Sequence, residues 1–441
     1  METTTLSDEA ILKGLNANPQ IKSRIASLLA AVEDAGGDLK VADAAEMRMI
    51  EEIRRMGQEA LQAWADRQVE KTEQELRQTG QVQREGKKLH WHTTFGEIEV
   101  AEPQYRRASS RIRPFVQSAK VSNRGCSRAL QRVVTDFGAD LPFAQVMDKL
   151  VEHYGIVLGE STIRHITEGH AQKVFEAAKP APSWPTRPGA SAVVIVEMDG
   201  GMVPLVECDP TQPDQRKGKK LYWKEAKICL AHPRGSKTLA FGGTLQGDVD
   251  KAGEHLFACA TQAGFGTNTS VHGVGDGAQW IANQVEDQFG AQGSYLLDLY
   301  HVCDYLSAAA KIIVTKSGAQ KAWMEEQKNR FKTGRPEQVL QALLPHMEAP
   351  EIADGDAPVR QCHRYLINRR DQLDYQGALE RGLPIGSGEI ESAHHYLVQQ
   401  RLKRSGAWWK PDNAEHMLAL RLNRANHQWK AYWAQDLKQA A

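Results

Sequence analysis

The segment SAVVIVEMD, residues 191–199, is a short apolar run that ends in an acid, and it predicts a buried β-strand. A second such run, SVHGVGDG at residues 270–277, carries Asp276 between two glycines. A carboxylate that follows an apolar strand and stands beside glycines lies at a sheet edge, where a ligand can approach. Asp199 and Asp276 therefore predict a site where neighbouring strands end, although a lone strand-end aspartate also suits a turn.

The segments around these two runs predict a mixed α/β sheet. Three strands come first, followed by helix, strand, helix, strand and helix, which is the element order of a ribonuclease-H-like fold. Residues about 310–380 are charged and helical and are expected to form an all-helical insertion in that fold. The segments between the two runs and after them are KICLA (227–231), KTLAFGGTL (237–245), VDKAGEHLFACATQAGF (249–265), AQWIANQVEDQF (278–289), SYLLDLY (294–300) and HVCDYLSAAAKII (301–313).

The N-terminal part of the chain has a different pattern. Helical spacing of apolar residues predicts one long amphipathic helix over about 43–78, and alternation predicts a β-hairpin over 90–107. Residues about 142–170 predict two helices around a turn, with Gly155 ending the first and Ser161 capping the second. This is a helix-turn-helix pattern, although any packed helical hairpin has the same spacing. In the DNA-reading interpretation, STIRHITEGHAQ is the recognition helix and presents Ser161, Thr162 and Arg164.

A proline-rich segment, KPAPSWPTRPGAS, predicts a boundary between domains, because proline at this density blocks both helix and sheet. The expected organisation has six parts. They are a helical N-terminal region (1–84), a DNA-binding region with a basic arm and helix-turn-helix (85–178), a linker (179–191), the first part of a catalytic core (192–310), a helical insertion (311–380), and the final helix and basic tail (381–441).

The composition of the 441 residues, with 41% hydrophobic and 25% charged, is that of an ordinary globular protein. No run approaches the ~20 apolar residues that a membrane helix needs, and the N-terminus has no signal-peptide pattern. We therefore expect a cytoplasmic protein with no membrane association. The six cysteines form no CxxC pair, which argues against a zinc ribbon or a redox motif.

The charges balance overall, 55 − 55 = 0, but they are unevenly distributed. Residues 103–135 hold eight basic residues and no acid, and residues 396–430 hold seven basic residues and two acids. Local positive charge suits phosphate contact, whereas two solvated charged faces, or a helix with core tryptophans, are the alternatives. The candidate DNA-binding residues in these runs are Arg106, Arg107, Arg111, Arg113, Arg401, Lys403, Arg404 and Trp408.

A third acid is expected from the stretch that follows the insertion. Residues 386–388, Gly-Ser-Gly, predict a tight turn before a helix whose first turn holds Glu389 and Glu391. These two glutamates face different sides of the helix, so only one is expected to reach a metal shared with the aspartates. Three converging carboxylates suit Mg²⁺ or Mn²⁺. Near the end of the fifth strand, His301 is a candidate for steadying a phosphate, oriented by Asp298.

Four segments resemble the DDE transposases of bacterial insertion sequences, specifically the ISKra group, and the likeness extends over about residues 85–435. The resemblance implies that Asp199, Asp276 and Glu391 bind two Mg²⁺ or Mn²⁺ ions, and that Asp298 and His301 form the DxxH motif of related transposases. Some relatives carry a CxxC pair near the first basic run, where this chain has only Cys126, so no zinc is expected there. The segments are EMDGGMVP (197–204), GVGDGAQWI (273–281), DLYHVCDYL (298–306) and IGSGEIESAHHYLVQQRLKRSGAWW (385–409).

The resemblance further implies a transposase that cleaves the ends of its element and joins the freed 3′-OH to target DNA by two-metal catalysis. Its partners would be the terminal inverted repeats, the target DNA and further copies of itself, with the helix at 43–78 as an expected interface. Two alternatives stay open. One is a ribonuclease-H-like nuclease that cuts without joining, and the other is a non-catalytic DNA-binding regulator.

Overall fold

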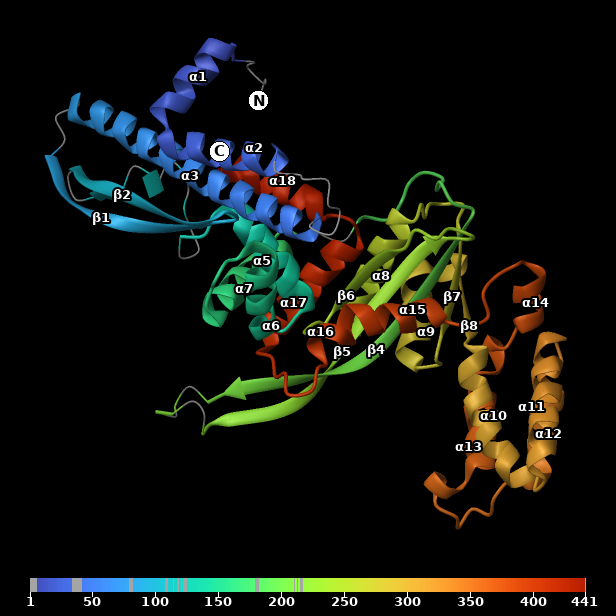
Figure 1. Ribbon diagram of the computed structural model, residues 1–441. Helices are drawn as coiled ribbons and strands as arrows, with labels where there is room; N and C mark the ends of the chain where they lie inside the picture. Colours follow the sequence, from blue (N-terminus) through green and yellow to red (C-terminus); the bar gives the residue numbers. More distant parts are fainter. Residues whose placement is uncertain are drawn as a thin grey trace. The chain divides into compact units, whose positions relative to one another are not determined.

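The computed structural model (Figure 1) divides into two compact units, one formed by residues 1–170 with 435–441 and the other by residues 171–434. The division falls within helix α7 (Glu160–Glu176), before the proline-rich segment in which the sequence predicts a boundary. Among the described residues, no helix has the length and apolar character needed to cross a membrane. The structure describes residues 6–33, 42–78, 82–107, 110–113, 115–116, 119, 121, 125–178, 182–209, 211, 213–214 and 217–440.

The first unit begins with three helices, α1 (Asp8–Ala17), α2 (Pro19–Glu33) and α3 (Ala42–Gln78). The long helix predicted at 43–78 is confirmed by α3. Arg24 of α2 donates a hydrogen bond over 2.9 Å to Glu59 of α3 and thereby ties the two helices together. Ala65 of α3 is fully buried, and it packs in one hydrophobic core with residues of a small sheet.

That small sheet consists of β1 (Val82–Thr93), β2 (Gly96–Arg107) and β3 (Ser110–Ile112), paired antiparallel in this order. The hairpin predicted at 90–107 is confirmed, and β1 extends further toward the N-terminus than expected. Ile98 and Val100 of β2 are buried together with Ala65 and Phe115, so the sheet and α3 share one core.

Three helices follow in the first unit: α5 (Arg128–Asp140), α6 (Phe143–Tyr154) and the part of α7 up to His170. They enclose an apolar cluster that includes Leu130, Val146 and Ile163. Gly155 ends α6 in the left-handed conformation, with φ of 63°, as predicted. The prediction that Ser161 caps α7 is wrong, because the helix already includes Glu160 and the carbonyl of Gly159 accepts its first backbone hydrogen bonds.

The second unit contains a five-stranded mixed sheet with the order β6-β5-β4-β7-β8. Strand β4 pairs antiparallel with β5 and parallel with β7, and β7 pairs parallel with β8. The predicted mixed α/β sheet is thus confirmed. The strands are β4 (Val193–Cys208), β5 (Lys219–Pro233), β6 (Ala240–Thr244), β7 (Ser270–Gly275) and β8 (Gly293–Leu297).

Helices cover both faces of this sheet because alternate side chains of β4 are apolar on both sides. Val194 and Val196 pack with α8 (Val249–Gln262) and α9 (Gln279–Phe289), whereas Ile195 packs toward α10 (Leu299–Ile313). The central strand is therefore buried on both faces, as its continuous apolar run predicts.

The predicted insertion is helical and shares the core of α10. Tyr305 of α10 stacks on Tyr365 with ring centroids 4.0 Å apart, which packs the insertion against α10. Its helices are α11 (Ser317–Lys332), α12 (Pro336–Leu343), α13 (Pro358–Ile367) and α14 (Tyr375–Glu380), with short 3₁₀ turns between them.

After the insertion, the chain returns to the sheet. Helix α15 (Gly388–His394) continues through a π-helical turn (His395–Gln399) into α16 (Gln400–Leu402), and α17 (Pro411–Ala425) and α18 (Trp429–Ala440) follow. Arg421 of α17 donates from Nε to the carbonyl of Leu397 over 2.7 Å, which satisfies a group in the π-helical turn. Such turns are frequent at functional sites.

The buried carboxylate of Glu415 anchors α17 to the end of β6. It accepts hydrogen bonds from the Thr244 hydroxyl (2.8 Å), Leu245 N (2.5 Å) and Gln246 N (2.7 Å).

We predict that Glu415→Ala lowers the free energy of unfolding by about 2–4 kcal/mol, because buried N–H groups lose their acceptor. Urea unfolding measures this loss. Asp412→Ala, which removes an exposed bond to Gln246, should change stability by less than about 0.5 kcal/mol. Equal losses would refute the anchoring role.

Candidate active site

Asp199 lies in the middle of β4 and not at the end of a strand, so this part of the sequence prediction is wrong. Strand β4 continues for nine residues beyond Asp199, to Cys208, because β5 pairs with it over that whole length. The two glycines after Asp199 are therefore strand residues. Gly201 is required by close packing, since a Cβ there would lie 1.9 Å from the His394 ring of α15.

Asp276 directly follows β7, as the sequence predicts, and the insertion holds its backbone in place. Its carboxylate accepts a hydrogen bond from Ala278 N (2.8 Å), and its carbonyl accepts one from the Tyr365 hydroxyl (2.6 Å). Arg369, whose guanidinium lies over the Tyr365 ring, donates to the carbonyl of Gly277 over 2.8 Å. The insertion is thus part of the support for this aspartate, which the sequence did not reveal.

Asp298 connects the end of β8 to the turn before α15. One carboxylate oxygen accepts from Tyr300 N (2.6 Å) and caps α10, and the other accepts from the backbone N–H (2.7 Å) and hydroxyl (2.6 Å) of Ser387. Asp298 is 1% exposed. The contact joins residues 89 positions apart in the chain. It fixes the position of Ser387, which directly precedes α15.

The two glutamates of α15 reach different partners, as their spacing predicts. Glu391 lies 3.2 Å from Nε2 of His301 on α10, whereas Glu389 lies 2.9 Å from Nε2 of His232 on β5. Glu391 and not Glu389 is therefore adjacent to His301.

Three charged groups act electrostatically on Asp199. Burial raises its pKa to about 6, opposed by the Gly200 N–H, and the charges of Asp276 and Glu391 raise it further while His301 lowers it. Residues from β4, the end of β7, α10 and α15 are therefore electrostatic neighbours. A set of negative charges with so little compensation suits a cation.

Glu197, two positions before Asp199 on the same face of β4, is a member of the site that sequence reasoning missed. It is 2% exposed, and its carboxyl oxygen accepts a hydrogen bond from Ile390 N over 2.8 Å. Burial raises its pKa to about 8, with a smaller contribution from Glu389. An acid inside an apolar strand, spaced by two from another acid, was the signal available in the sequence.

Three of the predicted residues form a group that can hold a metal ion. Among the described residues, Asp298, His301 and Glu391 each offer a ligand atom within 4.8 Å of the others. This group differs from the predicted trio and shares only Glu391 with it. Asp298 already accepts three hydrogen bonds, so we regard it as an anchor and His301 and Glu391 as the more available donors.

The predicted DNA-binding residues have different surroundings. Ser161 and Arg164 are exposed on α7 and Thr162 is half-buried, while Lys403 and Arg404 are exposed after α16. Arg401, by contrast, is 3% exposed and its guanidinium lies 4.7 Å from the centroid of the Trp409 ring, which is a packing position.

The first basic run is only partly described. Arg113 donates to the buried carboxylate of Glu102 over 3.0 Å, which gives it a structural partner. The side chains of Arg106, Arg107 and Arg111 lie outside the described residues, so their expected phosphate contacts stay predictions.

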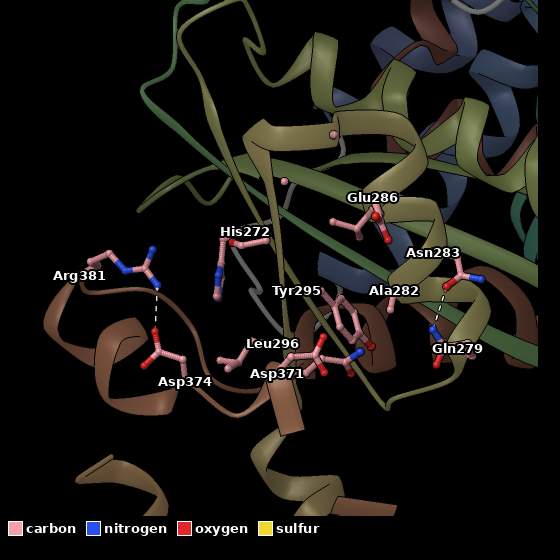
Figure 2. A pocket seen from close by; sticks show the side chains of 15 residues that line it. His272, Gln279, Ala282, Asn283, Glu286, Tyr295, Leu296, Asp371, Asp374 and Arg381 are labelled. Carbon is pink, nitrogen blue, oxygen red and sulfur yellow. Dashed lines mark hydrogen bonds and ion pairs between the residues drawn. The ribbon is translucent and has the colours of Figure 1, made fainter. Parts of the chain in front are cut away.

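A cavity of about 520 Å³ lies beside the outer strand β8, away from these carboxylates. Figure 2 shows Glu286 and Asn283 of α9 on one side, and Asp374 paired with Arg381 over 3.8 Å on the other. Buried His272 donates from Nε2 to the carbonyl of Pro384 at this wall. None of the five predicted catalytic residues lines the cavity, so it is separate from the candidate active site.

Comparison with known proteins adds no family assignment: no family model matches the chain, and no curated protein matches it. The fold and the cluster of acids define the class to which it can be compared, an α/β protein with a carboxylate-rich site on a mixed sheet.

The close approach of Gly201 to the His394 ring allows a test of how tightly α15 packs on β4. We predict that Gly201→Ala lowers the free energy of unfolding by about 1–3 kcal/mol, because the added Cβ pushes on a buried ring of the helix that carries Glu391. Thermal unfolding measures it. The control is Gly318→Ala in α11, where a Cβ meets nothing within 4 Å, and it should be neutral or stabilising. A harmless Gly201→Ala would refute the close seating.

Divalent metal should stabilise the protein through this site. With Mg²⁺ or Mn²⁺ at about a hundred times its dissociation constant, we expect a gain of about 2–3 kcal/mol over the protein in chelator. In chelator, Asp199→Asn should be more stable than the wild type by on the order of 1–2 kcal/mol, because a buried charge among like charges is removed. The same variant should lose the metal-induced gain. Calorimetry with and without metal distinguishes these results, and an unchanged gain in Asp199→Asn would exclude Asp199 as a ligand.

Proposed function

We propose that this protein is a DNA transposase with a ribonuclease-H-like catalytic domain, which cleaves the ends of its element and joins the 3′-OH to target DNA. The observation that carries the proposal is that buried Asp199 feels the charges of Asp276, Glu391 and His301, the last two lying 3.2 Å apart. These residues are spread over nearly two hundred positions and come from four elements of one mixed sheet and its covering helices. The three carboxylates of this set are hard oxygen donors, which suit Mg²⁺ or Mn²⁺, the ions used in phosphodiester transfer.

The residues that would hold two divalent ions are Asp199, Asp276 and Glu391, with His301 beside Glu391. Bound there, the ions would supply an activated water or 3′-OH and would stabilise the departing oxygen. The protein's own part is positioning. Asp298 sets the start of α15 through Ser387, and Tyr365 and Arg369 hold the backbone at Asp276 and Gly277. Glu197 fixes Ile390 N and with it the first turn that presents Glu391.

Recognition of DNA is proposed for the first unit. The helices α6 and α7 are joined by a glycine-capped turn, and α7 exposes Ser161 and Arg164 near its N-terminus. In a helix-turn-helix protein, residues near the start of the second helix contact bases in the major groove. The basic arm around Arg106 to Arg113 is proposed to contact phosphates of the element's ends.

The test is strand cleavage of DNA that carries the flanking ends of the gene's own element, with Mg²⁺ or Mn²⁺. We predict that Asp199→Asn, Asp276→Asn and Glu391→Gln each reduce cleavage by at least about a hundredfold. The matched control is Glu389→Gln, two positions from Glu391 and paired with His232, which should retain most activity. Cleavage that survives all three substitutions would remove the metal-site assignment.

A second substrate separates the proposal from its alternatives. With pre-cut ends and a target plasmid, a transposase gives strand-transfer products, whereas a nuclease of the same fold gives none. Binding of the ends without metal-dependent nicking under any of these conditions would instead indicate a DNA-binding regulator.

A further inference from the structure

The β4–β5 hairpin extends beyond the rest of the sheet and carries exposed apolar side chains. Strand β7 pairs with β4 only as far as Glu197, but β4 and β5 stay paired to Cys208 and Lys219 (Figure 1). On this extension Trp223 is 51% exposed and Leu221 is 52% exposed. Two large apolar side chains held in solvent on a projecting ribbon indicate an interaction surface.

A second segment, from far along the chain, adds to the same surface. Residues before α17 lie along the free edge of β4, where Val206 N donates to the carbonyl of Trp409 over 2.8 Å and Leu205 bridges to Trp409. This places Trp408, 41% exposed, edge-on to Trp223 with ring centroids 6.2 Å apart. Trp409 points the other way and is buried under Arg401. Two tryptophans from different segments thus form one exposed aromatic platform, named here the Trp223–Trp408 platform.

The charges around the platform indicate its partner. Lys219 and Lys220 of β5 are exposed, and Lys403, Arg404 and Lys410 are exposed on the segment that carries Trp408. Two acids of the hairpin are engaged within it. Glu207 accepts from the Tyr222 hydroxyl over 2.7 Å, and Glu225 pairs with Lys227 over 3.2 Å. Aromatic faces among lysines and arginines suit nucleic acid, with bases stacked on the rings and phosphates near the cations.

The position on β4 restricts which nucleotides can occupy the platform. Trp223 pairs with Pro204, five residues along β4 from Asp199, which is roughly 16 Å at the rise of a β-strand. Pro204 and Asp199 differ by an odd number of positions, so their side chains lie on opposite faces of the strand. The platform therefore cannot hold the reacting nucleotide, and at roughly 3.4 Å per nucleotide it lies several nucleotides away from the reacting phosphate.

We propose that the Trp223–Trp408 platform stacks unpaired bases of the DNA strand that flanks the cleavage site. The proposal rests on the proposed transposase function for its DNA substrate, but stacking itself needs neither metal nor cleavage. The platform differs from the helix-turn-helix surface, which addresses duplex DNA and belongs to the first unit.

The binding test uses a fluorescently labelled oligothymidine 20-mer and a 20-base-pair duplex, both in chelator so that no cleavage occurs. We expect Trp223→Ala/Trp408→Ala to weaken binding of the single strand by about tenfold or more, with a much smaller effect on the duplex. Trp223→Tyr, which keeps an aromatic face, should retain most of the affinity. Thermal unfolding checks that each variant is folded, and the exposed position of both rings predicts little change.

The outcomes are distinct for the two proposals. Equal single-strand binding by the wild type and the double alanine variant overturns the platform, and so does absence of single-strand binding by a wild type that nicks DNA. The platform would also be overturned if the wild type sediments as a dimer, the double variant sediments as a monomer, and both bind DNA equally. The patch would then be an interface between copies. Failure of the transposase proposal appears separately, as the absence of strand-transfer products from pre-cut ends, whether or not the platform binds single strands. Quenching of 2-aminopurine placed a few nucleotides from the cut, lost in the double variant, would support the stacking directly.

Discussion

The candidate active site depends on one buried carboxylate, that of Asp298, and on the three hydrogen bonds it accepts. Two of them come from Ser387, which lies beyond the whole helical insertion, and the third caps α10. An oxygen acceptor buried among N–H and O–H donors is costly to lose, because each donor left behind is unsatisfied. This contact fixes the entry of α15 against the end of β8. Glu391, His301 and, through the Ile390 N–H, Glu197 take their positions from it.

The acids around Asp199 illustrate a balance between stability and chemical use. The pKa of Asp199 is raised to about 6 and that of Glu197 to about 8, in both cases mainly by burial and further by neighbouring acids. In the protein without metal, burial among neighbouring acids disfavours the ionised form of both carboxyls, even though Asp199 accepts a hydrogen bond from Gly200 N and Glu197 accepts one from Ile390 N. Carboxyls kept at such a cost to folding are common at functional sites.

Much of the second unit was predictable, because its signals are local. The apolar runs of β4, β7 and β8, the helices between them and the insertion all follow from hydrophobic periodicity. The position of Asp199 did not follow, since a strand continues or ends according to its partner, and the pairing with β5 is set far away in sequence. The capping role given to Ser161 failed for a local reason, because the neighbouring Gly159 and Glu160 can also start a helix. Glu197, Tyr365 and Trp223 were missed because their roles depend on segments that meet only in the folded chain.

The insertion is a long segment, and the chain just before it and just after it is held together by the hydrogen bonds between Asp298 and Ser387. The entropy cost of closing a loop grows only with the logarithm of its length, so each doubling adds about 0.6 kcal/mol. Residues can therefore be added to or removed from the outer helices of the insertion at little energetic cost. The condition is that the Asp298–Ser387 hydrogen bonds and the contacts of Tyr365 and Arg369 with the Asp276 turn are kept. The outer end of the insertion is accordingly the place where this fold tolerates grafted domains or tags, and where related sequences are free to diverge most in length.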